Sequence, residues 1–113
     1  MTGAVAVVAN SGEFRAIAEP GFVAGLGSGQ KPFNTSPNAQ VTVSGGVGPF
    51  TYLWSRRSGV GGTPLSPHDP NTVFTIMMGP GTIVDSVFGC LVTDTATGFT
   101  TLTNDVQAQF QTF

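Results

Sequence analysis

The sequence predicts an all-β protein, and its composition and patterning both point that way. Val, Ile and Thr, whose branched side chains favour strands, account for 31 of the 113 residues, against five Leu and one Lys. Polar and apolar residues alternate over several short segments, as they do in a strand with one buried face. Gly and Pro, 24 residues together, separate these segments as turns do. A helical bundle, which needs Leu, Ala, Glu and Lys at a period of 3.6 residues, is excluded.

The first part of the chain, residues 1–38, differs from the rest. Short strands are expected over residues 5–8 and 14–18. Between residues 19 and 38, Gly, Ser, Asn and Pro predominate without periodicity, and apolar residues are isolated among them. A structureless stretch of this length is uncommon inside a compact domain. We therefore predict that residues 1–38 form an extended Gly/Pro-rich N-terminal arm with short strands, whose apolar residues bury in other surfaces.

The remaining residues, 39–113, carry a regular strand pattern. Strands are expected over residues 40–44, 50–56, 73–78, 85–93 and 99–110, with a long loop over residues 57–71. Strand signals that recur at short intervals, with turn residues between them, predict an antiparallel β-sandwich.

Two motifs lie within residues 39–113. In VSGGVGPFTYLWS, residues 43–55, a strand ends in a Gly-rich turn and an aromatic strand of the form Pro-aromatic-Thr-Tyr-x-Trp follows. In FGCLVTDTATG, residues 88–98, a Val-Thr-Asp segment leads into a turn that ends in Gly. In this order the motifs resemble the Ig-like and polycystic-kidney-disease-like modules of bacterial surface and phage proteins. The resemblance implies an Ig-like antiparallel β-sandwich with an extended N-terminal arm.

The same resemblance implies the residues of the core. In Ig sandwiches a Trp on the third strand packs against a disulfide between the sheets, and an aromatic residue lies two positions before the second Cys. Trp54 occupies the position of that Trp, and Phe88 and Cys90 have the spacing of the aromatic–Cys pair. The chain has no second Cys, so the disulfide is absent, which suits a reducing compartment. The expected structural core is Tyr52, Trp54, Phe88, Cys90 and Val92.

Few residues offer chemistry. Cys90 lies in an alternating apolar run, which favours a buried free thiol over a nucleophile. His68 precedes an Asp and could serve an acid–base or metal site, but the sequence has no Cys/His cluster to complete one, so an exposed turn is expected. The turn residues Asp94 and Asp105 lack the Asp-x-Asp density that favours Ca²⁺, and residues 25–31 lack the spacing of a phosphate loop. We expect a non-enzymatic protein with no cofactor and no metal.

Charge is scarce along the whole chain. Only 9% of the residues are charged, against about 25% in an ordinary soluble domain, and the formal net charge is −2. Four basic residues do not supply the footprint that nucleic-acid binding needs, and no apolar run approaches the ~20 residues of a membrane span. Sheet edges are commonly protected by Lys, and Lys31 is the only one. We therefore expect neighbouring chains to cover much of the surface.

An Ig-like module with little charge and no signal peptide resembles the structural proteins of tailed-bacteriophage virions. The resemblance implies a virion protein made in the host cytoplasm, such as a capsid decoration (cement) protein or a tail or neck protein. It would assemble through its arm and β-edges with major capsid or tail subunits and with further copies of itself, as a homo-oligomer. The expected assembly contacts are Phe14, Phe22, Leu26, Phe33, Phe110 and Phe113. An Ig-like binding module from a bacterial surface adhesin or a carbohydrate-binding protein is the alternative, and an enzyme would need a further cluster around His68.

Overall fold

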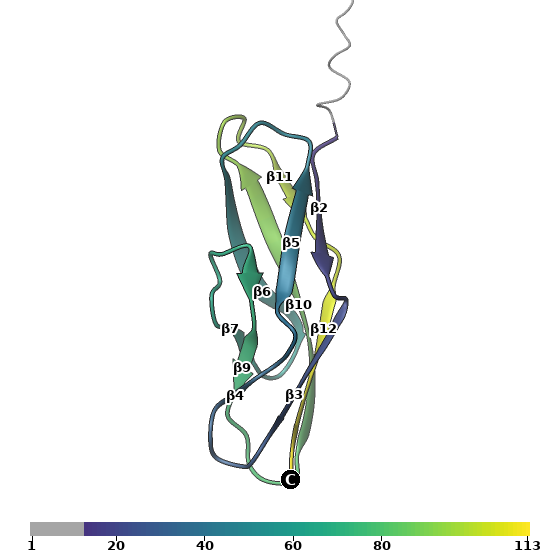
Figure 1. Cartoon of the computed structure of the whole chain (residues 1–113), viewed down its shortest axis with the longest axis vertical. Helices are drawn as coiled ribbons and strands as arrows, with labels where there is room; N and C mark the ends of the chain where they lie inside the picture. The colour runs from purple at the N-terminus through teal and green to yellow at the C-terminus, as the bar shows by residue number, and fades with distance from the viewer. Residues whose placement is uncertain (1–12) are drawn as a thin grey trace, which may run out of the picture.

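A computed structural model describes residues 13–113, which form strands, turns and connecting loops and contain no helix. The prediction of an all-β protein is confirmed. The longer strands run along the long axis of the molecule (Figure 1). Within residues 13–113, no helix exists that is long and apolar enough to cross a membrane.

The strands overlap the segments predicted after residue 39, but the loop predicted over residues 57–71 is corrected, because residues 57–59, 63–64 and 71 belong to strands. They are β2 (Arg15–Glu19), β3 (Phe22–Gly27), β4 (Phe33–Asn34), β5 (Ala39–Ser44), β6 (Phe50–Gly59), β7 (Thr63–Pro64), β8 (Asn71–Thr72), β9 (Phe74–Ile76), β10 (Ile83–Asp94), β11 (Thr100–Leu102) and β12 (Val106–Thr112).

The larger sheet is organised around β10, the longest strand. β6 pairs antiparallel with one side of β10, and β11 and β12 pair antiparallel with successive halves of its other side. β3 adds to β12 in parallel. A second sheet has the order β2-β5-β8, and a third, of short strands, has the order β4-β9-β7. All pairs within these two sheets are antiparallel, so the parallel β3–β12 pair is the exception to the predicted antiparallel pattern.

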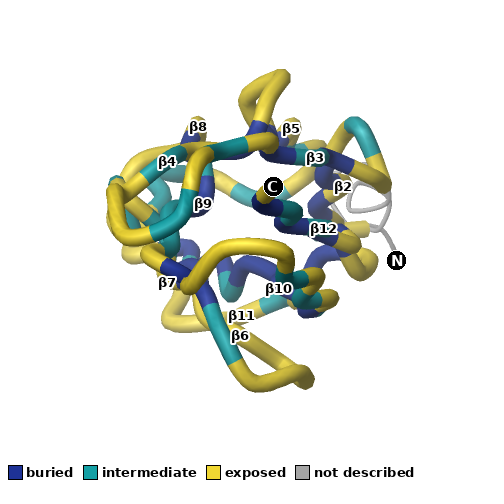
Figure 2. Tube along the Cα trace, turned by 90° about the horizontal axis from the view of Figure 1, so that it is seen from below, coloured by how far each residue is buried: buried dark blue, intermediate teal, exposed yellow. Residues whose placement is uncertain are grey.

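Aromatic rings fill the core between the sheets. Phe74 stacks on Phe88 with ring centroids 4.1 Å apart, and Trp54 packs edge-on against Phe74 at 5.7 Å. The indole N–H of Trp54 donates a hydrogen bond of 2.9 Å to the carbonyl oxygen of Asp69, which satisfies the buried polar group of the ring. Viewed along the long axis, buried segments surround the interior between β5 on one side and β10 on the other (Figure 2).

The described part of the predicted arm belongs to this sandwich. β2 pairs with β5 and β3 pairs with β12, and Ala16, Ala18 and Val23 are core residues. The boundary predicted at residue 38 is therefore corrected, because residues 13–38 pair with the later strands and share their core. Residues 1–12, which include the strand predicted over residues 5–8, lie outside the described residues.

Glycines explain why β3 has no strand pattern in the sequence. A Cβ on Gly25 would lie 2.8 Å from the carbonyl oxygen of Asn34, and one on Gly27 would collide with the ring of Phe33. Both positions need glycine because β4 and its flanking residues approach β3 closely. The composition that predicts an arm therefore reflects tight packing of β3 against β4.

Candidate interaction surface

The outer face of the larger sheet is the main candidate for a functional surface. We define it as the side chains of β3, β6, β10, β11 and β12 that point away from the core. The strand register aligns Leu53, Leu91 and Leu102 in one row across three strands. Leu53 is 44% exposed and Leu102 is 64% exposed. Three of the five leucines of the chain thus form an apolar row on a solvent-facing sheet.

Uncharged polar side chains accompany this row. Thr51, Thr93 and Thr100 form the neighbouring row on the same three strands. Further along the sheet, the outward positions of β12 are Gln107, Gln109 and Gln111. These hydroxyl and amide groups each combine a donor with an acceptor, so they can bond to a wide range of partners.

Apolar residues flank Gln107 and Gln111 on both sides. The register places Phe22 and Leu26 of β3 beside Gln107 and Gln111, and Ile83 of β10 on the other side of Gln111. The outer face therefore holds five of the twelve exposed large hydrophobic residues found in residues 13–113: Phe22, Leu26, Leu53, Ile83 and Leu102.

Two charges interrupt the outer face along β10. The guanidinium of Arg57 lies directly over Gly89, where any side chain would collide with it. Arg57 donates to the carboxylate of Asp105 at 2.7 Å and to the carbonyl oxygen of Thr103 at 2.9 Å. Asp85, four residues along β10 from Gly89, is exposed. Gly89 thus gives the arginine a defined position on the sheet.

The opposite outer face has a different character. On β2, the outward residues are Arg15, Ile17 and Glu19, and Ile17 is its one large apolar residue. Two of three outward positions on this strand are charged, which is typical of a solvated surface. The two faces of the sandwich are therefore unequal, and the larger sheet carries the apolar one.

The sheet edges are partly closed within the chain. On β6, the backbone N–H of Trp54 donates to the carbonyl oxygen of Pro67 at 2.9 Å. On β3, Ala24 exchanges two backbone hydrogen bonds with Ser36, at 3.2 and 2.9 Å. On β2, the side-chain amide of Asn104 bonds both backbone groups of Ala18, at 2.8 and 3.0 Å. Loops and one side chain thus take over the protection that lysines commonly provide.

The predicted core residues lie in the interior. Trp54, Phe88, Cys90 and Val92 are buried, and Tyr52 is half-buried against them. Burial raises the pKa of the Cys90 thiol, while a backbone hydrogen bond from Leu53 and the charge of Arg57 act weakly in the opposite sense. A buried thiol with a raised pKa is a poor nucleophile.

The predicted assembly contacts divide into two groups. Phe110 is fully buried and packs edge-on against Phe33 at 6.1 Å, so it is corrected to a core residue. Phe33 and Phe14 are half-buried, and Phe14 stacks on Phe50 at 5.7 Å. In contrast, the exposed fractions of the other three are 50% for Phe22, 65% for Leu26 and 76% for Phe113. Phe22 and Leu26 lie on the outer face, and Phe113 follows β12.

Sites for catalysis or metal binding find little support in the described residues. No group of three or more His, Cys, Asp and Glu side chains converges within residues 13–113. His68 is exposed, and its Nδ1 lies 3.3 Å from the carbonyl oxygen of Tyr52 at the edge of β6. The carboxylate of Asp94 accepts hydrogen bonds from backbone N–H groups of the adjacent turns.

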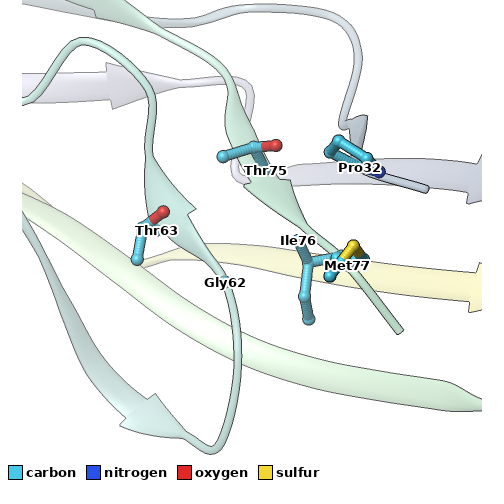
Figure 3. A pocket seen from close by; sticks show the side chains of 6 residues that line it. All are labelled: Pro32, Gly62, Thr63, Thr75, Ile76 and Met77. Carbon is cyan, nitrogen blue, oxygen red and sulfur yellow. The ribbon is translucent and has the colours of Figure 1, made fainter. Parts of the chain in front are cut away.

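An open hollow of about 340 Å³ lies beside the short sheet (Figure 3). Its lining consists of Pro32, Gly62, Thr63, Thr75, Ile76 and Met77. Threonine hydroxyls are its polar side-chain groups, and one of them, on Thr75, already donates to the carbonyl oxygen of Phe33 at 3.2 Å. The lining offers no titratable side chain for catalysis.

No protein-family model, curated protein or solved structure matches this chain.

Proposed function

We propose that this chain is a non-enzymatic structural protein of a tailed-bacteriophage virion, a capsid decoration (cement) protein or a tail or neck protein. The observation that carries the proposal is the outer face of the larger sheet, where an exposed leucine row and further apolar residues lie among uncharged polar side chains and few charges. Exposed apolar rows of this kind mark surfaces that another protein covers. In a large assembly, neighbouring subunits cover the contact surfaces of each subunit.

The strand order supports an Ig-like sandwich as the scaffold. In that fold one sheet contains strands A, B and E and the other contains strands C, F and G. The sheet β2-β5-β8 corresponds in chain order to A, B and E, and β6, β10 and β12 correspond to C, F and G. Trp54, on the strand that corresponds to C, is the register partner of Cys90 on the strand that corresponds to F. The two paired residues come from the two motifs of the sequence, Trp54 from residues 43–55 and Cys90 from residues 88–98.

The exposed anchors support assembly with capsid or tail subunits. Phe22, Leu26 and Phe113 project from neighbouring strands or from the C-terminal end of the last one, and each is at least half exposed. Full burial of an exposed side chain of this size contributes roughly 1.5–3 kcal/mol, and Phe22, already half-buried, contributes about half of that.

Particle fractionation tests this function. Virions from the source of the gene are purified on a density gradient, and the chain is quantified in each fraction by mass spectrometry. We expect it to co-sediment with major capsid or tail proteins in a fixed copy ratio and to be released by mild denaturant. A chain found only outside particles, or one that instead binds glycans in an array and is attached to a cell surface, would overturn the proposal.

A further inference from the structure

We propose that the outer face of the larger sheet binds a second copy of this chain, through a two-fold axis that crosses β10 at Val87. The outward residues of β10 form a self-complementary series about this point. Val87 is at the centre, Asp85 and Gly89 lie two residues away on either side, and Ile83 and Leu91 lie four residues away. The pairing concerns the isolated chain and does not depend on the virion proposal.

Charge complementarity favours a second copy as the occupant. The guanidinium of Arg57 occupies the position over Gly89, so β10 presents a cation on one side of Val87 and the carboxylate of Asp85 on the other. The two positions are four residues apart, about 13 Å along the strand. A two-fold axis midway between them brings Arg57 of each copy opposite Asp85 of the other. Within a single copy, Arg57 pairs with Asp105, whereas Asp85 has no ion pair among the described residues. In the dimer, each Asp85 gains an ion pair with Arg57 of the other copy, which then lies between two carboxylates.

The apolar rows match under the same operation. Leu91, in the row with Leu53 and Leu102, falls opposite Ile83 of the second copy, because both lie four residues from the axis. Leu102 falls opposite the aliphatic part of Gln111, the register partner of Ile83. Sheets that stack face to face cross at about 30°, so the residues nearest the axis stay aligned.

The polar groups of the face are also compatible with a copy of themselves. Gln107, the register partner of Val87, lies at the axis and meets its own copy there, and its amide carries both donors and an acceptor, so the two copies can bond to one another. A face built of lysines or of carboxylates would repel its own copy. The outer face of the sheet β2-β5-β8, with Arg15 and Glu19 on β2, lacks the leucine row and provides a control surface.

Sedimentation velocity of the purified full chain over a range of concentrations tests the pairing. We expect a reversible dimer in the wild type. Asp85→Lys sets a cation against Arg57 and is expected to weaken the dimer at least about tenfold. Glu19→Lys makes the same change in net charge on a β2 position of the opposite face and is expected to leave the dissociation constant within about twofold.

Two further measurements keep the test decisive. Circular dichroism establishes that each variant retains its β spectrum. If Asp85→Lys does not fold, Asp85→Asn, which removes the ion pair without adding a charge, is expected to weaken the dimer by a smaller factor. A wild type that sediments as a monomer at all concentrations would overturn the proposal. So would a dimer equally sensitive to Glu19→Lys, or insensitive to both Asp85 variants.

Discussion

At the scale of single residues, the buried carboxylate of Asp94 joins two turns at one end of the sandwich. It accepts hydrogen bonds from the backbone N–H groups of Val47 at 2.8 Å, Ala96 at 3.0 Å and Gly48 at 3.2 Å. The bond from Val47 lowers the pKa of this carboxyl most, burial acts against it, and the bonds from Ala96 and Gly48 lower it further. The Gly-rich turn before β6 and the turn after β10 are thus held together by one ionised group.

Replacing Asp94 tests this role through the dependence of stability on pH. Because its pKa in the folded state is below the unfolded value of about 3.9, the carboxylate stabilises the fold above that value. This stabilisation is lost as the pH falls through the folded pKa. We expect Asp94→Asn to lower the melting temperature at pH 7 and to differ little from the wild type near pH 2. Thermal melts across this range measure the difference, with Asp69→Asn, an exposed loop residue, as the control. A difference independent of pH would contradict the assignment.

Two phenylalanines of the C-terminal strand region provide a comparison between core and surface. Phe110 is fully buried, whereas Phe113 is 76% exposed. Truncation of a buried Phe loses its transfer free energy and leaves a cavity, so Phe110→Ala is expected to lower the free energy of unfolding by about 3–5 kcal/mol. Phe113→Ala is expected to change it by less than about 0.5 kcal/mol. Denaturant unfolding measures both. Equal losses of unfolding free energy in the two variants would contradict the larger contribution expected from the buried Phe110.

At the scale of elements, strands with alternating side chains are predictable from sequence and strands defined by their neighbours are not. The strand expected over residues 40–44 lies within β5, and the one expected over residues 85–93 lies within β10. In β3, by contrast, Gly25 and Gly27 are required by contacts with β4, which no local pattern encodes. The predicted strand over residues 99–110 is interrupted after β11, where the Thr103 hydroxyl accepts the backbone N–H of Cys90 at 3.0 Å.

The candidate surface follows the same division. Its individual outward residues can be read from alternation on β6 and β10, but their alignment cannot. Leu53, Leu91 and Leu102 form a row only because three strands pair in a particular register. The position of Arg57 depends on a β-bulge between β6 and β10 and on the absence of a side chain at Gly89. Local alternation predicts which residues point outward, but the register between distant strands determines which of them are neighbours on the surface.

The side chain of Asn104 connects the edge of β2 to the larger sheet, and this link is testable. Its Oδ1 accepts the N–H of Ala18, and its Nδ2 donates to the carbonyl oxygen of the same residue. Asn104→Asp retains the acceptor but replaces the donor with a second acceptor that faces a carbonyl. We expect a loss of about 1–3 kcal/mol and faster hydrogen exchange along β2. Asn34→Asp, at an exposed position of β4, serves as the control. Unchanged exchange on β2 would contradict the link.

At the scale of the whole molecule, the N-terminal strands are part of the folding unit. β2 and β3 contribute Ala16, Ala18 and Val23 to the core. Phe33 of β4 packs against Phe110 of β12. The last strand, β12, depends on β3 as its parallel neighbour, with pairs from Phe22 to Gly27. A small domain buries a limited area on folding and is only marginally stable, so the loss of β2 and β3 is expected to remove a large share of its stability.

A pair of truncations tests this interdependence. A fragment of residues 39–113 lacks β2, β3 and β4, so it would expose the core surfaces that these strands cover and would leave one edge of β12 and one edge of β5 without a partner. We expect it to be unfolded or aggregated, with no dispersed amide signals in NMR spectra. A fragment of residues 13–113 retains every strand from β2 to β12 and is expected to give a dispersed spectrum and a cooperative melt. Folding of residues 39–113 on their own, with a melting temperature close to that of the longer fragment, would restore the arm as a separate element and refute the single folding unit.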